Sequence, residues 1–129
     1  MRIAITADNH LNQNQNSPER YETFKRILEA CKLHEITLLI IAGDLFERSL
    51  LNYHDFEVLV NQHRPTDTKI IIIPGNHDQD LTETQIAARG VRVYSEPTLL
   101  PINKDWWMLL VPYRNNKNMG QVIAQFNTE

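Results

Sequence analysis

The sequence has one cysteine, no excess of cations and no long apolar run. The 129 residues contain only Cys31, so the chain cannot form an internal disulfide. We interpret Cys31 as a small core residue of a helix rather than a nucleophile. No apolar run approaches the roughly 20 residues that a membrane helix needs, and the first residues resemble a strand more than a signal peptide. These absences predict a cytoplasmic protein without a membrane partner.

The chain also lacks the positive charge that a large nucleic-acid-binding surface usually carries. Its formal net charge is −3, which disfavours such a surface on the bare chain. Bound divalent cations would reverse the charge locally, where a phosphate would bind. The apolar content of 42% and charged content of 22% are ordinary for a globular protein. The length suits one domain, and we expect residues 1–129 to form a single one.

Three short apolar segments alternate with two helical patterns in the first part of the chain. We expect strands at residues 2–7, 37–42 and 69–73, and helices at residues 18–34 and 51–63. Ser17 and Pro18 are residue types that begin helices. The alternation predicts an α/β fold with parallel strands, and crossover helices on one face of the sheet. Because the strand segments are apolar on both faces, another layer should cover the second face.

The remaining residues predict a short, mostly β segment. We expect a short helix at residues 81–89 and strands at residues 91–94, 98–100 and 106–111. A last helix should occupy residues 121–126. We expect Trp106 and Trp107 to pack inside a second sheet.

Each of the first three expected strands ends in residue types that bind metals. Asp8 and His10 follow the first strand, Asp44 follows the second, and Asn76 and His77 follow the third. The carboxyl ends of parallel strands meet at one edge of a sheet, where open α/β folds place their chemistry. D-x-H and GD are weak signals alone and GNHD after an isoleucine run is moderately specific, but the three together in this order are strong evidence for one site.

The residue types suit two divalent ions. Asp8 and His10 alternate on an expected extended segment, so both can reach one ion, and Asp44 can bridge two ions. The Asn76 carbonyl is a neutral ligand for the second ion. Two ions about 3.5–4 Å apart clamp a phosphate between them. His77 is then free to donate a proton to the leaving oxygen.

Other polar residues near these motifs allow more than one interpretation. We expect Asp78 to orient His77, as carboxylates orient histidines elsewhere. The polar run at residues 12–16 is either a solvated loop or a lining of the site beside His10. His34, His54 and His63 lie on expected helices, and we interpret them as structural or solvent-facing.

The series D-x-H, GD and GNHD resembles the signature of the calcineurin-like metallophosphoesterases. GDLF at residues 43–46 and VPYR at residues 111–114 resemble the SbcD-type branch, whose nucleases process DNA double-strand breaks. The resemblance implies the N-terminal half of that family's α/β/β/α sandwich. It also implies the following roles: first-metal ligands Asp8 and His10, bridging ligand Asp44, second-metal ligand Asn76 and catalytic acid His77.

The resemblance further implies a Mn²⁺-dependent DNA exonuclease and endonuclease that works as a dimer with an SMC-like ATPase. Mg²⁺, Fe or Zn²⁺ would also suit these ligand types. In the family, a further ligand histidine and a G-H-x-H turn follow GNHD, yet residues 79–129 contain no histidine. We therefore expect two ions, one ion or none, and weak or no activity of this chain alone. A truncated product, a split enzyme or an N-terminal fragment would explain the pattern.

Three functions remain open at this level. The first is hydrolysis of DNA phosphodiesters, within a longer or split nuclease. The second is a catalytically dead remnant that binds a completing chain or itself through an uncovered sheet face. The third is hydrolysis of nucleotides or small phosphodiesters, because the motifs do not determine the substrate.

Overall fold

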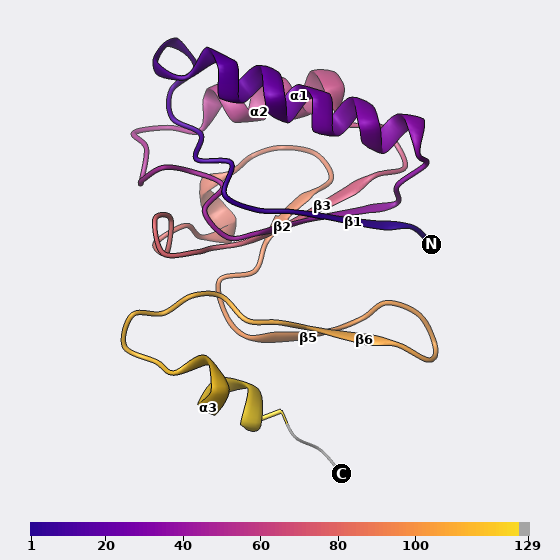
Figure 1. The fold of residues 1–129 in the computed structure, drawn as a ribbon, viewed down its shortest axis with the longest axis vertical. Coiled ribbons are helices and arrows are strands. Elements are labelled where there is room, and N and C mark those ends of the chain that lie inside the picture. Colours follow the sequence, from indigo (N-terminus) through magenta and orange to yellow (C-terminus); the bar gives the residue numbers. More distant parts are fainter. Residues whose placement is uncertain (127–129) are drawn as a thin grey trace.

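The computed structural model describes residues 1–126. Its strands and helices follow one another as a layered α/β arrangement with a smaller β unit below (Figure 1). In chain order the elements are β1 (Ile3–Thr6), η1 (Asn14–Asn16), α1 (Pro18–Leu33), β2 (Leu38–Ala42), α2 (His54–His63), β3 (Lys69–Ile73), η2 (Glu83–Gln85), β4 (Val91–Val93), β5 (Thr98–Pro101), β6 (Trp107–Leu110) and α3 (Met119–Ala124).

The main sheet is parallel, as predicted. Its four strands lie in the order β1-β2-β3-β4, so each new strand adds to the same edge. Ile5 pairs with Ile40, and Ile40 pairs with Ile71 on the next strand. Side chains of β2 are buried on both faces of the sheet, which explains its unbroken apolar sequence. Because these strands are parallel and in register, the carboxyl ends of β1, β2 and β3 lie together at one end of the sheet.

Helices α1 and α2 cover the same face of this sheet (Figure 1), which confirms the predicted crossover arrangement. Buried side chains recur along α1 at three- and four-residue steps, so one stripe of the helix faces the sheet. Phe24 of α1 packs against Phe56 of α2, and Phe56 packs against Phe46 from the loop after β2. The core on this face also contains Leu11, Leu28, Leu39, Ile41, Val60, Ile70 and Ile72.

The antiparallel β5–β6 hairpin packs on the opposite face, so the predicted second layer is present, but it leaves Ile5 of β1 68% exposed. Leu110 of β6 joins Leu38, Ile40 and Ile71 of the main sheet in a smaller buried cluster. The expectation that Trp106 and Trp107 pack inside this layer is wrong. Their exposed fractions are 69% and 59%. Trp107 lies on the face of β6 opposite Met108 and Leu110, which pack toward the main sheet. Trp106 lies in the turn between β5 and β6, before β6 begins.

Several element boundaries differ from the expected ones. Helix α2 begins at His54 rather than residue 51, because the Asn52 side chain accepts a hydrogen bond from the His54 N–H and makes a turn there. Residues 81–89 form only the 3-10 turn η2 instead of a helix. The buried side chains of Leu81 and Ile86 and the bond from the Ala87 N–H to Glu57 tie this segment to the core. The last helix begins at Met119, and residues 127–129 lie outside the described residues.

The environment of Cys31 agrees with its interpretation from the sequence. Cys31 is buried in the core, and burial raises the pKa of its thiol, as expected of an inert core residue. Among residues 1–126, no helix is long and apolar enough to cross a membrane.

Candidate metal centre

The loops that follow β1 and β2 run side by side. Backbone N–H groups of Asp8 and His10 donate to the carbonyls of Gly43 and Asp44, at 3.1 and 3.0 Å. The Leu11 N–H then donates to the Leu45 carbonyl at 2.7 Å. This short parallel ladder continues the pairing of the two strands beyond their ends. It places the D-x-H segment directly against the GD turn.

The loop after β3 closes onto the same turn. The His77 N–H donates to the Asp44 Oδ1 atom at 2.8 Å. Gly75 lies so close that a Cβ atom there would be 2.5 Å from Asp44 Oδ1 and 2.9 Å from the Gly43 Cα. The approach of the two loops therefore requires glycine at position 75. All three motifs meet, as the sequence predicts.

Asp78 has partners other than the expected one. Its buried carboxylate accepts hydrogen bonds from the Gly75 N–H at 2.7 Å and the Phe46 N–H at 3.0 Å. The Phe46 bond joins the GNHD loop to the GD loop, and the Gly75 bond closes the GNHD loop on itself. Hydrogen bonds to a charged group contribute about 1.5–3 kcal/mol each. Asp78 thus positions the loop that carries His77 rather than the His77 ring.

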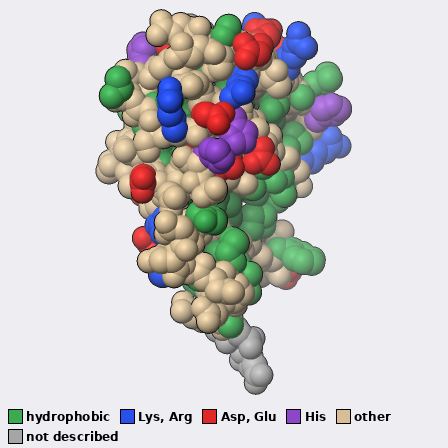
Figure 2. All heavy atoms as spheres, turned by 60° about the vertical axis from the view of Figure 1, so that its left-hand side comes forward, with side chains coloured by type: hydrophobic (Ala, Val, Ile, Leu, Met, Phe, Trp, Pro, Cys, Tyr) green, Lys and Arg blue, Asp and Glu red, His purple; other side chains and the backbone are tan. Residues whose placement is uncertain are grey.

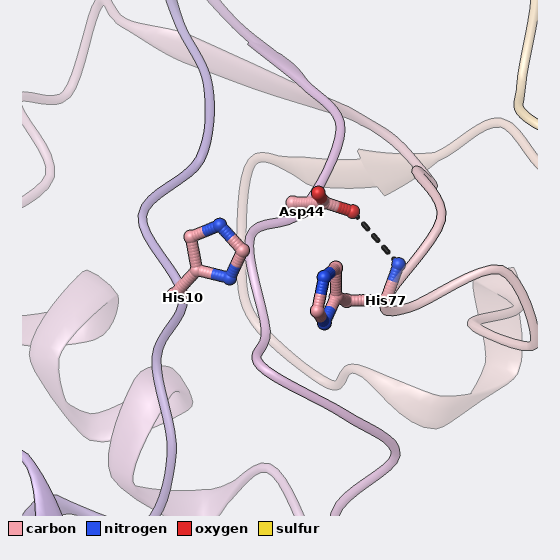
Figure 3. A group of neighbouring side chains, drawn as sticks. All are labelled: His10, Asp44 and His77. Atoms are coloured by element: carbon pink, nitrogen blue, oxygen red, sulfur yellow. Dashed lines mark hydrogen bonds between the residues drawn. The ribbon is translucent and has the colours of Figure 1, made fainter.

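The three motifs bring His10, Asp44 and His77 together (Figure 3). Ring nitrogens of the two histidines and a carboxylate oxygen of Asp44 lie within 4.8 Å of one another, close enough to share an ion. The two rings meet edge to face, with centroids 5.0 Å apart. This is the group of potential metal ligands that the described residues bring together, and it contains one residue from each motif.

Asp8 lies beside the group, on a backbone that differs from the expected extended one. Its φ of 56° and the φ of 50° at His10 are both left-handed, a conformation that non-glycine residues rarely adopt. The turned backbone still brings Asp8 Oδ1 to 3.7 Å from His10 Nε2. The Asp8 side chain is 72% exposed, so its carboxylate is open to a ligand. Left-handed residues held by their surroundings often mark functional sites.

The other predicted site residues are less closely tied. Asn76 is exposed on the loop between Gly75 and His77, where its side chain can turn toward the group. The residues of the polar run at 14–16 form the exposed η1 turn. His34 is exposed at the end of α1, and His54 is exposed at the start of α2. Neither they nor His63 belong to the cluster found in the described residues.

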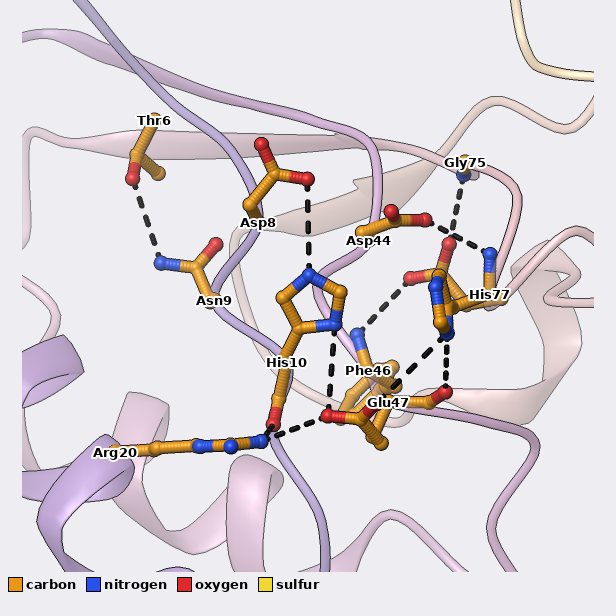
Figure 4. Close-up of polar contacts among 11 residues, drawn as sticks. Thr6, Asp8, Asn9, His10, Arg20, Asp44, Phe46, Glu47, Gly75 and His77 are labelled. Carbon is orange, nitrogen blue, oxygen red and sulfur yellow. Dashed lines mark hydrogen bonds and ion pairs between the residues drawn. The ribbon is translucent and has the colours of Figure 1, made fainter.

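Glu47 is a site residue that the sequence patterns do not reveal (Figure 4). Its carboxylate oxygens lie 3.6 Å from His10 Nδ1 and 3.8 Å from His77 Nδ1. Its backbone carbonyl lies 3.0 Å from His77 Nδ1. Arg20 donates to the carboxylate at 2.8 Å. In the sequence, Glu47 is an acidic residue three positions after Asp44 in the same loop. Spacing alone does not show where a loop residue points, so the sequence does not place Glu47 in the site.

The Glu47 carboxylate lies near three basic side chains, those of Arg20, His10 and His77. The pKa of Glu47 lies below its usual value, first because Arg20 donates a hydrogen bond to the charged form. Partial desolvation acts in the opposite direction, and charge on His10, Arg20 and His77 lowers the pKa further. In the space-filling view, histidine side chains lie among acidic and basic ones on one part of the surface (Figure 2).

The donor set fits a divalent metal ion. Imidazole nitrogens and carboxylate oxygens suit Mn²⁺, Zn²⁺ and Fe, and a carboxylate can bridge. The buried His10 Nδ1 has no hydrogen-bond partner among the described residues, although Glu47 lies just beyond bonding distance. A ring nitrogen in that state is available to a cation or to a slightly displaced Glu47.

Comparisons with known proteins identify the family of this chain. Residues 1–124 match the calcineurin-like phosphoesterases. The chain belongs to the calcineurin-like phosphoesterase family.

Two curated relatives are named as the SbcD component of the nuclease SbcCD, one from Escherichia coli strain K12 and one from Escherichia coli O157:H7. Each is 34% identical to this chain over 112 residues, which covers 78% of this chain and 26% of the relative. The chain therefore spans about a quarter of the length of the curated relatives it matches. The similarity confirms the resemblance to the SbcD-type branch.

A Gly75→Ala variant tests whether the close approach of the loops maintains the site. The added methyl group would collide with Asp44 Oδ1 at 2.5 Å and with the Asp44 backbone N at 2.6 Å. We expect a loss of about 1–3 kcal/mol in the free energy of unfolding, measured with urea, and weaker Mn²⁺ binding in calorimetry. Gly120→Ala is the control, since its methyl group meets only the end of the Asn118 side chain. Unchanged Mn²⁺ affinity in Gly75→Ala would contradict this account.

Proposed function

We propose that this chain contributes the metal-binding half of a site that hydrolyses phosphodiester bonds of DNA. The observation that carries the proposal is the convergence of the D-x-H, GD and GNHD loops on one group of ligands. Membership of the phosphoesterase family supports the reaction class. The relatives are named as a component of a nuclease, which supports nucleic acid as the substrate.

Four residues of this chain would serve as metal ligands. Asp8, His10 and Asp44 would hold the first ion, most simply Mn²⁺, and Asp44 with Asn76 would contribute to a second. When bound, the ions neutralise phosphate charge and activate water for attack. The left-handed backbone at Asp8, His10 and Asp44 presents these side chains at the rim of the sheet without further movement of the strands.

His77 is the group best placed to protonate the leaving oxygen. Its Nδ1 atom lies 3.0 Å from the Glu47 carbonyl, and a carbonyl oxygen only accepts, so Nδ1 carries a proton. The opposite nitrogen, Nε2, is then the one that can donate to a substrate. The Glu47 carboxylate oxygen Oε1 lies 3.8 Å from the same Nδ1 atom.

The relatives are named as one component of a nuclease, and we propose that this chain also works within an assembly. The partner would be an SMC-like ATPase, and histidine ligands from outside residues 1–129 would complete the site, because residues 79–129 contain none. Within that assembly, two copies of this chain would form a dimer.

A His77→Ala variant separates a proton donor from a metal ligand. A general acid contributes about 10²–10⁴-fold, and less when the leaving group is already a weak base. We expect Mn²⁺-dependent cleavage of an oligonucleotide to fall by that factor. Cleavage of bis-p-nitrophenyl phosphate, which has a better leaving group, should fall less. Mn²⁺ affinity in calorimetry should stay close to that of the unmodified chain.

His54→Ala is the matched control, because His54 is exposed at the start of α2 and lies outside the cluster. Activity unchanged by His77→Ala would reject the acid assignment. A large loss of Mn²⁺ affinity would instead make His77 a ligand, as its distance from His10 and Asp44 also allows.

A second candidate function is association with another copy of the chain. It is supported by exposed apolar side chains of the β5–β6 hairpin, namely Leu99 and Trp107 on the strands and Trp106 in the turn between them. Exposed aromatic clusters of this kind are typical of interfaces. This function does not require the metal site to be active.

Sedimentation velocity across a wide range of concentrations tests this association. We expect the sedimentation coefficient of the chain to rise with concentration, and the Trp106→Ser/Trp107→Ser variant to remain monomeric. Leu51→Ser is the control, because Leu51 is fully exposed on the loop before α2. A chain that stays monomeric at every concentration would contradict the proposal.

A further inference from the structure

Arg20 connects helix α1 to the candidate metal centre without being one of its expected ligands. It lies in the first turns of α1, and its Nη1 atom donates to two acceptors from different loops (Figure 4). One is the His10 carbonyl at 2.6 Å, and the other is the Glu47 Oε2 atom at 2.8 Å. A single guanidinium nitrogen therefore joins the loop after β1 to the loop after β2.

The contact with His10 supports a strained part of the backbone. His10 has a φ of 50°, and Asp8 two residues earlier has a φ of 56°. Such conformations persist only when the surrounding structure holds them. The His10 N–H is already bound to the Asp44 carbonyl. Arg20 binds the carbonyl of the same residue, so both backbone polar groups of His10 are held.

The contact with Glu47 determines where that carboxylate points. Glu47 Oε2 faces Arg20, and the same atom lies 3.6 Å from His10 Nδ1. The other oxygen, Oε1, lies 3.8 Å from His77 Nδ1. Without Arg20, the carboxylate would be free to turn toward either ring and to compete for a bound cation. Arg20 balances the charge of the Glu47 carboxylate and holds it in its present position beside both rings.

A purely stabilising role explains this geometry less well. The side chains of Arg20 and Glu47 are 44% and 37% exposed, and exposed ion pairs contribute little to global stability. The effect of Arg20 should therefore appear in the site and not in the unfolding of the whole chain. Groups that orient metal ligands from the second layer often change metal affinity or activity by large factors.

We propose that Arg20 is a positioning residue of the metal centre, which acts through the His10 carbonyl and the Glu47 carboxylate to fix the His10 and His77 rings. The proposal rests on the proposed function in taking these two histidines as the working groups of the site. It assigns to helix α1 a role in the site in addition to covering the sheet.

The experiment compares Arg20→Met with Arg26→Met in the full 129-residue chain. Arg26 is an exposed residue of the same helix and serves as the matched control. Nitrogen-15 NMR of the metal-free chain at fixed pH reports the tautomer and ordering of each histidine ring. We expect the His10 and His77 ring signals to change in Arg20→Met and not in Arg26→Met. His54 signals should stay the same in both variants.

Activity supplies the second readout. With Mn²⁺ and bis-p-nitrophenyl phosphate, we expect Arg20→Met to lower kcat about tenfold or more and to leave KM nearly unchanged. Arg20→Lys should recover part of the loss, because an ammonium group can still reach one acceptor. Glu47→Gln combined with Arg20→Met should be no worse than the more damaging single variant, since the two residues act as one unit.

The outcomes separate this inference from the proposed function. If the unmodified chain shows no turnover, the hydrolytic function fails for the isolated chain, and the ring signals alone decide the role of Arg20. Ring signals in Arg20→Met that match those in Arg26→Met would overturn the inference. Additive losses in the double variant would also overturn it. If Arg20→Met does not fold, the milder Arg20→Lys replaces it: a smaller change in the His10 and His77 ring signals is then expected, and signals that match those in Arg26→Met would overturn the inference.

Discussion

The candidate site depends on the set of bonds that Asp44 makes with both neighbouring loops. Its carbonyl accepts from the His10 N–H, its Oδ1 atom accepts from the His77 N–H, and Gly75 packs against it. These contacts form only because β1, β2 and β3 are parallel and adjacent, so their three carboxyl ends reach the same edge. Asp44, the residue proposed to bridge two ions, is thus also the residue that holds the three loops together.

Polar groups behind the ligands maintain this arrangement. The buried Asp78 carboxylate joins the two later loops through backbone N–H groups, while Arg20 and Glu47 join the two earlier ones. The left-handed backbone at Asp8, His10 and Asp44 is held between these anchors. Side chains fixed in advance of binding cost less to order when a cation and a phosphate arrive, which favours a metal site over an accidental cluster.

The sequence predicts the strands and their metal-ligand ends well, because apolar runs and the residues that end them are local signals. It does not predict the partner of Asp78, since a carboxylate beside a histidine is equally able to bind backbone N–H groups. The sequence does not predict Glu47, because residue types in a loop do not recur at the regular spacing that marks a helix or a strand. The expected positions of Trp106 and Trp107 are wrong for two reasons. Trp106 lies in the hairpin turn, and the face of β6 that packs on the sheet depends on register, which a short strand does not reveal.

The most direct test of the central claim is a calorimetric titration of Mn²⁺ into the chain and into Asp44→Asn and Asp80→Asn. Asparagine at position 44 keeps an oxygen that can accept the His77 N–H bond, so this variant removes mainly the charge of the bridging group. The account predicts a loss of at least about tenfold in affinity for Asp44→Asn. Asp80→Asn, in the exposed loop after GNHD, should bind Mn²⁺ as the unmodified chain does. Equal affinities in the two variants would contradict a metal site at the meeting point of the three loops.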